Sequence, residues 1–407
     1  MNKRCYYPIL LVSACFAVVA CSSTTVRTTE QTKIVTQGLE QTPEEQLLDV
    51  GVNLFDPGFD PAAEQEQVFP DVRRAEARYM PNILATTLQN TGSWGAVRII
   101  PHRQSEADLW VDGEILVSDG SVLKLRVTVQ DSTGTVWFTR DYEEFASKYA
   151  YDKNSLHMSE PFQGLYNRIA NDMLAYRNKI DPERVDEIRK ITELKFARRF
   201  SPEAFADFVT TDDQGHHVIT RLPARNDPLL QRISRIRERD YLFVDTMQDY
   251  YQAYFRHMEE AYFQWRFASY KETEELNKIK ADAKKRIAGG IFAAVAGIAV
   301  NAATSDSSSS AARTVGDAAG VIGIGAGAVL IKSGLDKGSE AKMQVETLRE
   351  IAASLDAEIE PHSVALEDQT VTLSGTVEQQ YDQWREILRQ IYIAETGNIA
   401  AAPISAP

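Results

Sequence analysis

"ADLWVDGEILVSDG" (residues 107–120), "VLKLRVTVQD" (Val122–Asp131) and "TVWFTRDYEE" (residues 135–144) are three neighbouring segments in which apolar and polar residues alternate. A period of two residues predicts β-strands that bury one face. Asp119-Gly120 and Thr133-Gly134 stand between the segments and are typical hairpin turn signals. The sequence therefore predicts three strands joined by two tight turns.

The preceding stretch predicts an earlier strand, a helix and a second strand. "LLDVGVNLF" (residues 47–55) mixes Val and Leu and stops at an Asp-Pro-Gly turn, as a buried strand would. In residues 71–92, apolar positions recur at steps of three and four, which predicts a helix that Pro81 should kink or restart. "AVRIIP" (residues 96–101) follows as a strand. Residues 46–150 are thus expected to form a β-α-β-β-β-β module.

This order resembles the N-terminal domain of periplasmic lipoproteins of the curli-secretion (CsgG-like) type and of the Pel exopolysaccharide ring lipoproteins. The likeness is carried by "VGVNLF", the helix from Asp71, "WGAVRIIP", "EADLWVDGEI" and "VTVQDSTGTVWF". The resemblance implies a soluble α/β module that assembles into rings under the outer membrane, and hence a homo-oligomer. The chain lacks the pair of long alternating strands that a curli-type secretion channel pushes through the bilayer.

The N-terminus has the features of a secretory signal with a lipidation site. Lys3 and Arg4 precede an apolar run, and Val18-Val19-Ala20-Cys21 forms a lipobox. The run is short for a membrane span of ~20 residues, which disfavours an uncleaved anchor. We expect residues 1–20 to be removed and Cys21 to carry the lipid. By resemblance to bacterial lipoproteins, the absence of Asp just after Cys21 implies the outer membrane, periplasmic face.

The cysteine content and the net charge argue against several classes of function. Cys5 and Cys15 leave with the signal, so the mature chain keeps no thiol for a disulfide, a metal site or a nucleophile. The net charge of -14 becomes about -16 without Lys3 and Arg4 (-14 - 2). Nucleic-acid binding is not expected, because phosphate neutralisation needs clustered Lys and Arg. Residues 21–45 are polar and rich in Thr and Gln, which predicts a flexible tether.

Helices dominate from residue 151 onward. Residues 151–226 are expected to be helical with a short break, because Asp181-Pro182-Glu183 has the cap and the first-turn proline of a helix start. "HHVIT" (residues 216–220) in the break reads as a short strand. Residues 227–356 are expected to form a long helical hairpin, whose first arm carries an apolar and aromatic stripe. The stripe predicts a core or subunit face, with a sugar-stacking platform as the alternative. Its members are Phe243, Met247, Tyr250, Tyr254, Met258, Ala261, Trp265 and Ala268.

Two apolar runs rich in small residues, residues 287–303 and 318–335, flank a Ser-rich tip. They are expected to form the two arms of the hairpin near its tip. A four-residue spacing of Gly and Ala lets helices approach closely and resembles a glycine zipper. The zipper residues are Gly289, Ala293, Gly297, Ala319, Gly323 and Gly327.

Three interpretations of the zipper remain open: packing between subunits or of the hairpin on itself, insertion into a bilayer as a pore or transport component, and a simple intramolecular core. Each run is near the lower limit of about 17 residues for a transmembrane helix. Lys284, Lys285 and Arg286 oppose the positive-inside rule for a hairpin that enters the inner membrane from the periplasm. Glycine in a water-exposed helix costs ~1 kcal/mol relative to alanine, so the zipper needs close helical neighbours.

Residues 357–397 are expected to form a small C-terminal unit. "HSVAL" and "TVTLSGTV" predict two strands, and an amphipathic helix follows. "VTLSGTV" resembles the BON domain, a small periplasmic module associated with phospholipid or envelope attachment, but the family's closing strand is missing. Residues 398–407 are expected to be a disordered tail.

Catalytic and metal-binding patterns are sparse. No HExxH motif includes any of the six histidines, and no G-x-S-x-G elbow occurs. "GIGAGA" (residues 323–328) has no strand before it, which argues against a phosphate cradle. We therefore predict no catalytic residue, no metal ligand, no cofactor and no enzymatic activity. A cell-wall-active enzyme is the distant alternative.

The whole chain is predicted to be α+β, with an N-terminal β-α-β-β-β-β module, a long α-helical hairpin and a small C-terminal β-β-α unit. The predicted function is that of a lipoprotein anchored in the outer membrane through Cys21. It would serve as a structural or assembly subunit of an envelope complex for secretion or polysaccharide export. Its expected partners are membrane lipid, copies of itself and unidentified envelope proteins.

Overall fold

The computed structural model describes residues 32–36, 43–59, 69–100, 107–147, 149–151, 160–224, 226–302, 347, 349–350, 362–365 and 370–396. The predicted α+β class is confirmed by a five-stranded sheet, a long helix and a small C-terminal strand pair with a helix. The elements are η3 (Glu44–Gln46), β1 (Val50–Asn53), α2 (Pro70–Asn90), β2 (Val97–Ile100), β3 (Leu109–Ser118), β4 (Val122–Asp131), β5 (Val136–Phe145), α3 (Gln163–Arg177), α4 (Pro182–Phe200), α5 (Pro202–Phe205), β6 (Val209–Thr211), β7 (His217–Ile219), α6 (Pro228–Ala302), β8 (His362–Ala365), β9 (Thr370–Leu373) and α9 (Val377–Thr396).

The five-stranded sheet has the order β2-β1-β3-β4-β5. β1 pairs in parallel with β2 and β3, whereas β3, β4 and β5 pair antiparallel. Parallel neighbours need a crossover connection, and α2 provides it between β1 and β2. Both predicted hairpin turns form, because Gly120 and Gly134 adopt positive φ angles of 77° and 90°. The predicted β-α-β-β-β-β order is therefore confirmed.

Gly120 also lets the β3–β4 hairpin touch α6 directly. A Cβ atom at this position would lie 2.3 Å from the carbonyl oxygen of Arg266. The hydroxyl of Ser269 donates to the carbonyl oxygen of Asp119 at 2.7 Å. Backbone contact and a hydrogen bond thus hold the hairpin tip on the long helix.

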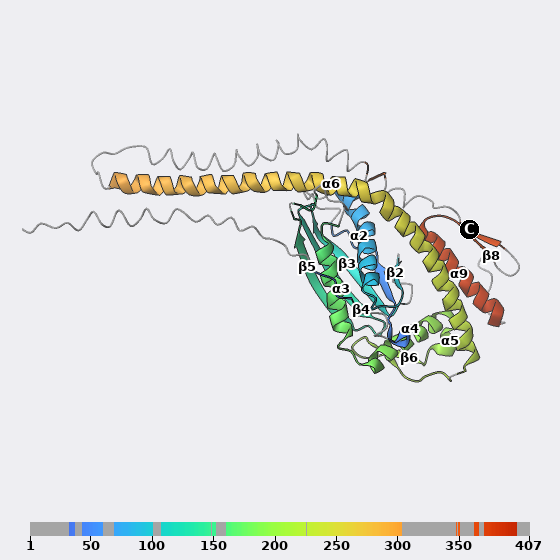
Figure 1. Cartoon of the computed structure of the whole chain (residues 1–407). Helices are drawn as coiled ribbons and strands as arrows, with labels where there is room; N and C mark the ends of the chain where they lie inside the picture. Colours follow the sequence, from blue (N-terminus) through green and yellow to red (C-terminus); the bar gives the residue numbers. More distant parts are fainter. Residues whose placement is uncertain are drawn as a thin grey trace, which may run out of the picture. The chain divides into compact units, whose positions relative to one another are not determined.

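Helices α2 and α3 lie against the same face of the sheet (Figure 1). On that face Trp137 of β5 stacks on Tyr176 of α3, with ring centroids 4.7 Å apart. The opposite face is polar, and Arg126 pairs there with Glu114 and Asp141 at 3.2 and 2.9 Å. The alternation in the sequence therefore matches the burial of side chains. The inward residues of β4 are Leu123, Leu125, Val127 and Val129, all buried.

Helix α2 runs unbroken through Pro81, so the expected restart does not occur. Pro81 has no N–H group to offer the carbonyl oxygen of Ala77, four residues earlier. The backbone N–H of Phe55, just after β1, donates to that oxygen at 2.9 Å instead. The helix continues because a residue from another part of the chain supplies the missing hydrogen bond.

The aromatic stripe of α6 lies in the core of the fold. Tyr254 donates to the carbonyl oxygen of Ala75 on α2 at 3.2 Å. Phe243 stacks on Trp384 of α9, with centroids 4.9 Å apart. The interpretation of the stripe as a core face is therefore confirmed, because its rings pack on other elements of the same chain. Its buried members include Phe243, Met247, Tyr254, Met258 and Trp265.

Helix α6 also covers the edge strand β2. The side-chain amide of Gln248 accepts from the N–H of Ile99 at 2.8 Å and donates to its carbonyl oxygen at 3.0 Å. Arg98 pairs with Asp245 at 2.6 Å beside it. Gln248 thus takes the place of a neighbouring strand at one position of an edge that would otherwise be open.

Part of the predicted hairpin falls within the described residues. Gly289, Ala293 and Gly297 belong to the continuous helix α6, of which only the backbone is described from residue 283 on. Residues 303–346 lie outside the described part, and so does Cys21. Within the part of the chain that is described, no helix has both the length and the apolar character needed to cross a bilayer. The expectation of a transmembrane helix therefore has no support there.

Candidate functional site

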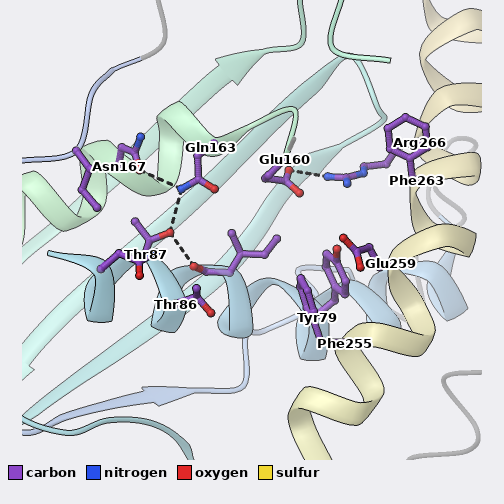
Figure 2. A pocket seen from close by; sticks show the side chains of 13 residues that line it. Tyr79, Thr86, Thr87, Glu160, Gln163, Asn167, Phe255, Glu259, Phe263 and Arg266 are labelled. Carbon is purple, nitrogen blue, oxygen red and sulfur yellow. Dashed lines mark hydrogen bonds and ion pairs between the residues drawn. The ribbon is translucent and has the colours of Figure 1, made fainter. Parts of the chain in front are cut away.

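A pocket of about 420 Å³ lies between α2, α3 and α6 (Figure 2). Aromatic rings and hydrogen-bonding side chains both reach it, a mixture that is typical of ligand sites. One side is closed by Ile34, which lies far from the other residues in sequence. The lining comprises Ile34, Tyr79, Ile83, Thr86, Thr87, Asn90, Glu160, Gln163, Asn167, Phe255, Glu259, Phe263 and Arg266.

The aromatic part of the pocket is built where α2 meets α6. Tyr79 of α2 stacks on Phe255 of α6 with centroids 4.4 Å apart and an interplanar angle of 11°. Tyr262, about two turns further along α6, meets the same Tyr79 ring edge-on at 4.8 Å. Figure 2 shows the rings of Tyr79 and Phe255 side by side. These contacts fix the two helices relative to each other at the pocket.

A buried ion pair forms one end of the pocket. The guanidinium of Arg266 donates to the carboxylate of Glu160 at 2.6 Å, and the two side chains are only 4% and 11% exposed. The guanidinium also lies 4.3 Å from the centre of the Tyr262 ring. Burial opposes the charge of Arg266, but the carboxylate of Glu160 and nearby tyrosines raise its pKa well above the usual value. Arg266 is therefore charged and holds residue 160 against α6.

An acidic side chain outside the lining, Glu76, is linked to the pocket through Tyr262, which contacts Tyr79. Glu76 of α2 is fully buried and accepts hydrogen bonds from Ser118 and Tyr262 on one oxygen. Among the described residues, its other oxygen has no hydrogen-bond partner, although Arg73 lies 3.7 Å away. Burial raises the pKa of Glu76. The polar groups around Glu76 therefore join α2, β3 and α6 inside the core.

A row of three amides lies on α3, and two of them, Gln163 and Asn167, line the pocket. Gln163, Asn167 and Asn171 are spaced four residues apart and so project from one side of the helix. The amide nitrogen of Gln163 donates to Thr87 of α2 and to the side-chain oxygen of Asn167, both at 3.0 Å. These bonds leave the nitrogen of Asn167 directed outward, toward another acceptor.

The amide row binds the backbone of residues 32–36. Asn167 donates to the carbonyl oxygen of Thr32 at 2.8 Å. Asn171 donates to the carbonyl oxygen of Lys33 at 2.9 Å and accepts from the N–H of Val35 at 2.8 Å. The side chain of Ile34, between these contacts, lines the pocket. Part of the predicted tether is therefore docked on α3.

The segment just before β1 is held in the same manner. Arg189 of α4 donates to the carbonyl oxygen of Glu44, and Arg177 of α3 donates to that of Gln46, both at 2.9 Å. Here too, side chains of helices bind main-chain oxygens. The described parts of residues 32–46 are thus fixed by contacts with α3 and α4.

The sequence-predicted site residues contribute little to this pocket. Cys21, Ala319, Gly323 and Gly327 lie outside the described residues, and Gly289, Ala293 and Gly297 belong to the part of α6 whose side chains are not described. Among the described side chains, no cluster of three or more His, Cys, Asp or Glu could hold a metal ion. The amide row was missed. The sequence pattern that could have revealed it is the four-residue spacing of the amides on α3. They lie on a different side of the helix from the buried apolar residues Leu165, Ile169 and Met173.

Comparison with known proteins gives a weak likeness. No family model matches the chain, and no curated protein matches it. Among solved structures, the chain is similar to a PelC dodecamer from Paraburkholderia phytofirmans, with a TM-score of 0.20 and 14% identity. The match covers 36% of this chain and 95% of that one. A likeness at this level carries no functional conclusion.

Proposed function

We propose that this chain is a lipoprotein anchored through Cys21 on the periplasmic face of the outer membrane. In this proposal it is a structural or assembly subunit of an envelope complex for secretion or polysaccharide export, and it associates with copies of itself. It has no catalytic role. The lipobox that ends at Cys21 supports the anchoring.

The observation that carries the assembly role is the continuity of α6. Thr273 donates to the carbonyl oxygen of Asp119 at 3.4 Å, and α6 continues for 29 residues beyond it (302 - 273). At 1.5 Å per residue this is about 44 Å of helix. The stretch includes Gly289, Gly290 and Gly297, each of which costs ~1 kcal/mol relative to alanine in a solvated helix. Such a helix is stable when another helix packs closely on it, from the return arm or from a second copy.

The sheet offers a second surface for association. β5 is the last strand of the sheet order on the side away from β2. Val136 and Phe145, near its two ends, are 49% and 43% exposed. An edge strand with exposed apolar side chains is suited to contact with another chain. This supports self-association through the N-terminal module as well.

The anchoring is tested by two serine substitutions in the full-length chain. Because Cys21 is the lipid attachment point in this proposal, Cys21→Ser should leave an uncleaved precursor at the inner membrane or a mislocalised protein. Cys15→Ser, which changes a cysteine inside the predicted signal, is the matched control and should fractionate with the outer membrane. If Cys21→Ser also reaches the outer membrane as a mature lipoprotein, the assignment is wrong. Mass spectrometry of the mature N-terminus identifies the lipid directly.

A further inference from the structure

We propose that α3 is a clamp for the lipid tether, and that the amide row of Gln163, Asn167 and Asn171 sets the length of chain between the lipid and the folded part. The clamp itself is independent of lipidation, whereas its effect on membrane distance rests on the proposed anchoring at Cys21. The occupant of the clamp is residues 32–36 of the same chain.

Asn167 and Asn171 bind the main chain of the tether and not its side chains. All three hydrogen bonds that Asn167 and Asn171 form with the tether are made to backbone groups of Thr32, Lys33 and Val35. The side chains of Lys33 and Val35 are exposed. Only Ile34 turns inward, to the pocket. One apolar side chain therefore fixes the register, and the amides fix the path.

One amide of the clamp is oriented by contacts that do not involve the tether. Gln163 is held by its bond to Thr87 of α2 and orients the oxygen of Asn167. An amide whose oxygen is already engaged presents its nitrogen as a donor, and this is what the carbonyl oxygen of Thr32 requires. Asn167 is thus oriented by its neighbour Gln163 on α3, which Thr87 of α2 holds in turn, and this lowers the entropic cost of docking.

Docking shortens the free tether by half. Eleven residue steps separate Cys21 from Thr32 (32 - 21), which span at most about 40 Å when fully extended. Without the clamp, Glu44 is the first residue of the described part of the chain whose main chain is held, and the 23 steps from Cys21 (44 - 21) span at most about 80 Å. The clamp therefore keeps its site on α3 within about 40 Å of Cys21, the residue that carries the lipid in our proposal.

Trypsin cleavage after Lys33 tests the clamp in the full chain, with or without lipid. The exposed Lys33 side chain is a trypsin site, but the protease needs the backbone that the amides hold. Asn167→Leu/Asn171→Leu should speed this cleavage about tenfold or more relative to cleavage after Arg27, because three backbone hydrogen bonds are lost. Asn178→Leu, an exposed amide at the end of α3, is the control and should leave the ratio unchanged. If the ratio of cleavage after Lys33 to cleavage after Arg27 is the same in the wild type and in both variants, the proposed clamp is wrong.

Energy transfer in liposomes tests the effect on distance. The lipidated full chain carries a dye at Asp213→Cys, on the exposed β6–β7 turn, and the bilayer carries an acceptor lipid. A Gly-Ser insertion after Thr29 should lower the transfer, whereas the same insertion after Gly38 should not, because the clamp lies between the two sites. In the Asn167→Leu/Asn171→Leu background, both insertions should lower it. Equal effects of both insertions in the wild-type background would contradict the proposal. A chain that fails to bind liposomes at all would refute the anchoring at Cys21 and leave the trypsin result standing.

Discussion

The carbonyl oxygen of Ala77 accepts its hydrogen bond from the backbone N–H of Phe55 at 2.9 Å, in the middle of helix α2. In a regular helix the donor would be residue 81, which is proline here. The chain after β1 thus satisfies the one acceptor that the proline would leave open. This contact joins the sheet to the helix that covers it.

Pro81→Ala tests how well Phe55 compensates. A proline inside a helix usually costs ~3 kcal/mol, part of which is the lost hydrogen bond. Since the Ala77 oxygen already has a donor, we expect the substitution to raise the free energy of unfolding by less than ~1 kcal/mol. Urea denaturation measures this change in the free energy of unfolding. A gain near the full cost of a helical proline would mean that the Phe55 contact contributes nothing.

The sequence predicts the local features of this fold because they depend on neighbours in the chain. The strands β3 to β5 follow from alternation, and their turns follow from glycines at positive φ. The start of α4 follows from Asp181 and Pro182, although the side chain of Asp181 makes no capping hydrogen bond. Of the two outcomes expected at Pro81, a kink or a restart, the restart is wrong because the compensating donor comes from a residue 26 positions earlier than the proline (81 - 55).

The candidate site could not be predicted from local patterns. The charge of Arg266 is buried because Glu160, far away in sequence, lies beside it. The docking of residues 32–36 depends on amides more than 130 residues later. A polar, Thr-rich composition predicts a flexible tether and contains no information about such a partner.

The Arg266–Glu160 pair predicts strong coupling between two substitutions. Arg266→Met leaves the carboxylate of Glu160 in a buried place without its partner, and we expect a loss of ~3–5 kcal/mol in the free energy of unfolding. Arg266→Met/Glu160→Gln removes both charges and should recover a large part of that loss. A double-mutant cycle by urea denaturation measures the coupling energy between the two substitutions. Simple additivity of the two single changes would show that the pair is not coupled.

Asp240 of α6 predicts a pH dependence of stability. Burial raises the pKa of this carboxyl to about 6, even though three arginines lie near enough to lower it. The folded state then binds the proton more tightly than the unfolded state, so stability falls as the pH rises from about 4 to about 6. The shift corresponds to about 3 kcal/mol, which is the cost present above pH 6 and absent below pH 4.

Asp240→Asn should remove most of this dependence. We expect the variant to gain stability over the wild type at pH 7.5, and the two to converge near pH 4. Urea midpoints at a series of pH values measure the difference. Asp249→Asn, an exposed position on the same helix, is the control and should follow the wild-type curve. If Asp240→Asn also follows that curve, the carboxyl of Asp240 does not cause the pH dependence of stability.

The tip of the predicted hairpin distinguishes packing from membrane insertion. A single cysteine at Ser308 should react with an impermeant thiol reagent added from the periplasmic side, because in our proposal the hairpin packs on protein. Protection that detergent removes would favour insertion. Insertion would also make Ala294→Arg costly by ~3 kcal/mol, whereas a packed hairpin would show no change in membrane extraction.

The native mass of the full-length lipidated chain in detergent tests self-association most directly. We expect the wild type to have the mass of several copies. Gly289→Leu/Gly297→Leu adds bulk on the zipper face of α6 and should reduce the mass, whereas Ala288→Leu/Ala299→Leu adds bulk away from that face and should leave it unchanged. A wild-type mass of one copy at micromolar concentration would contradict the assembly role, and so would an equal loss of mass in the two variants.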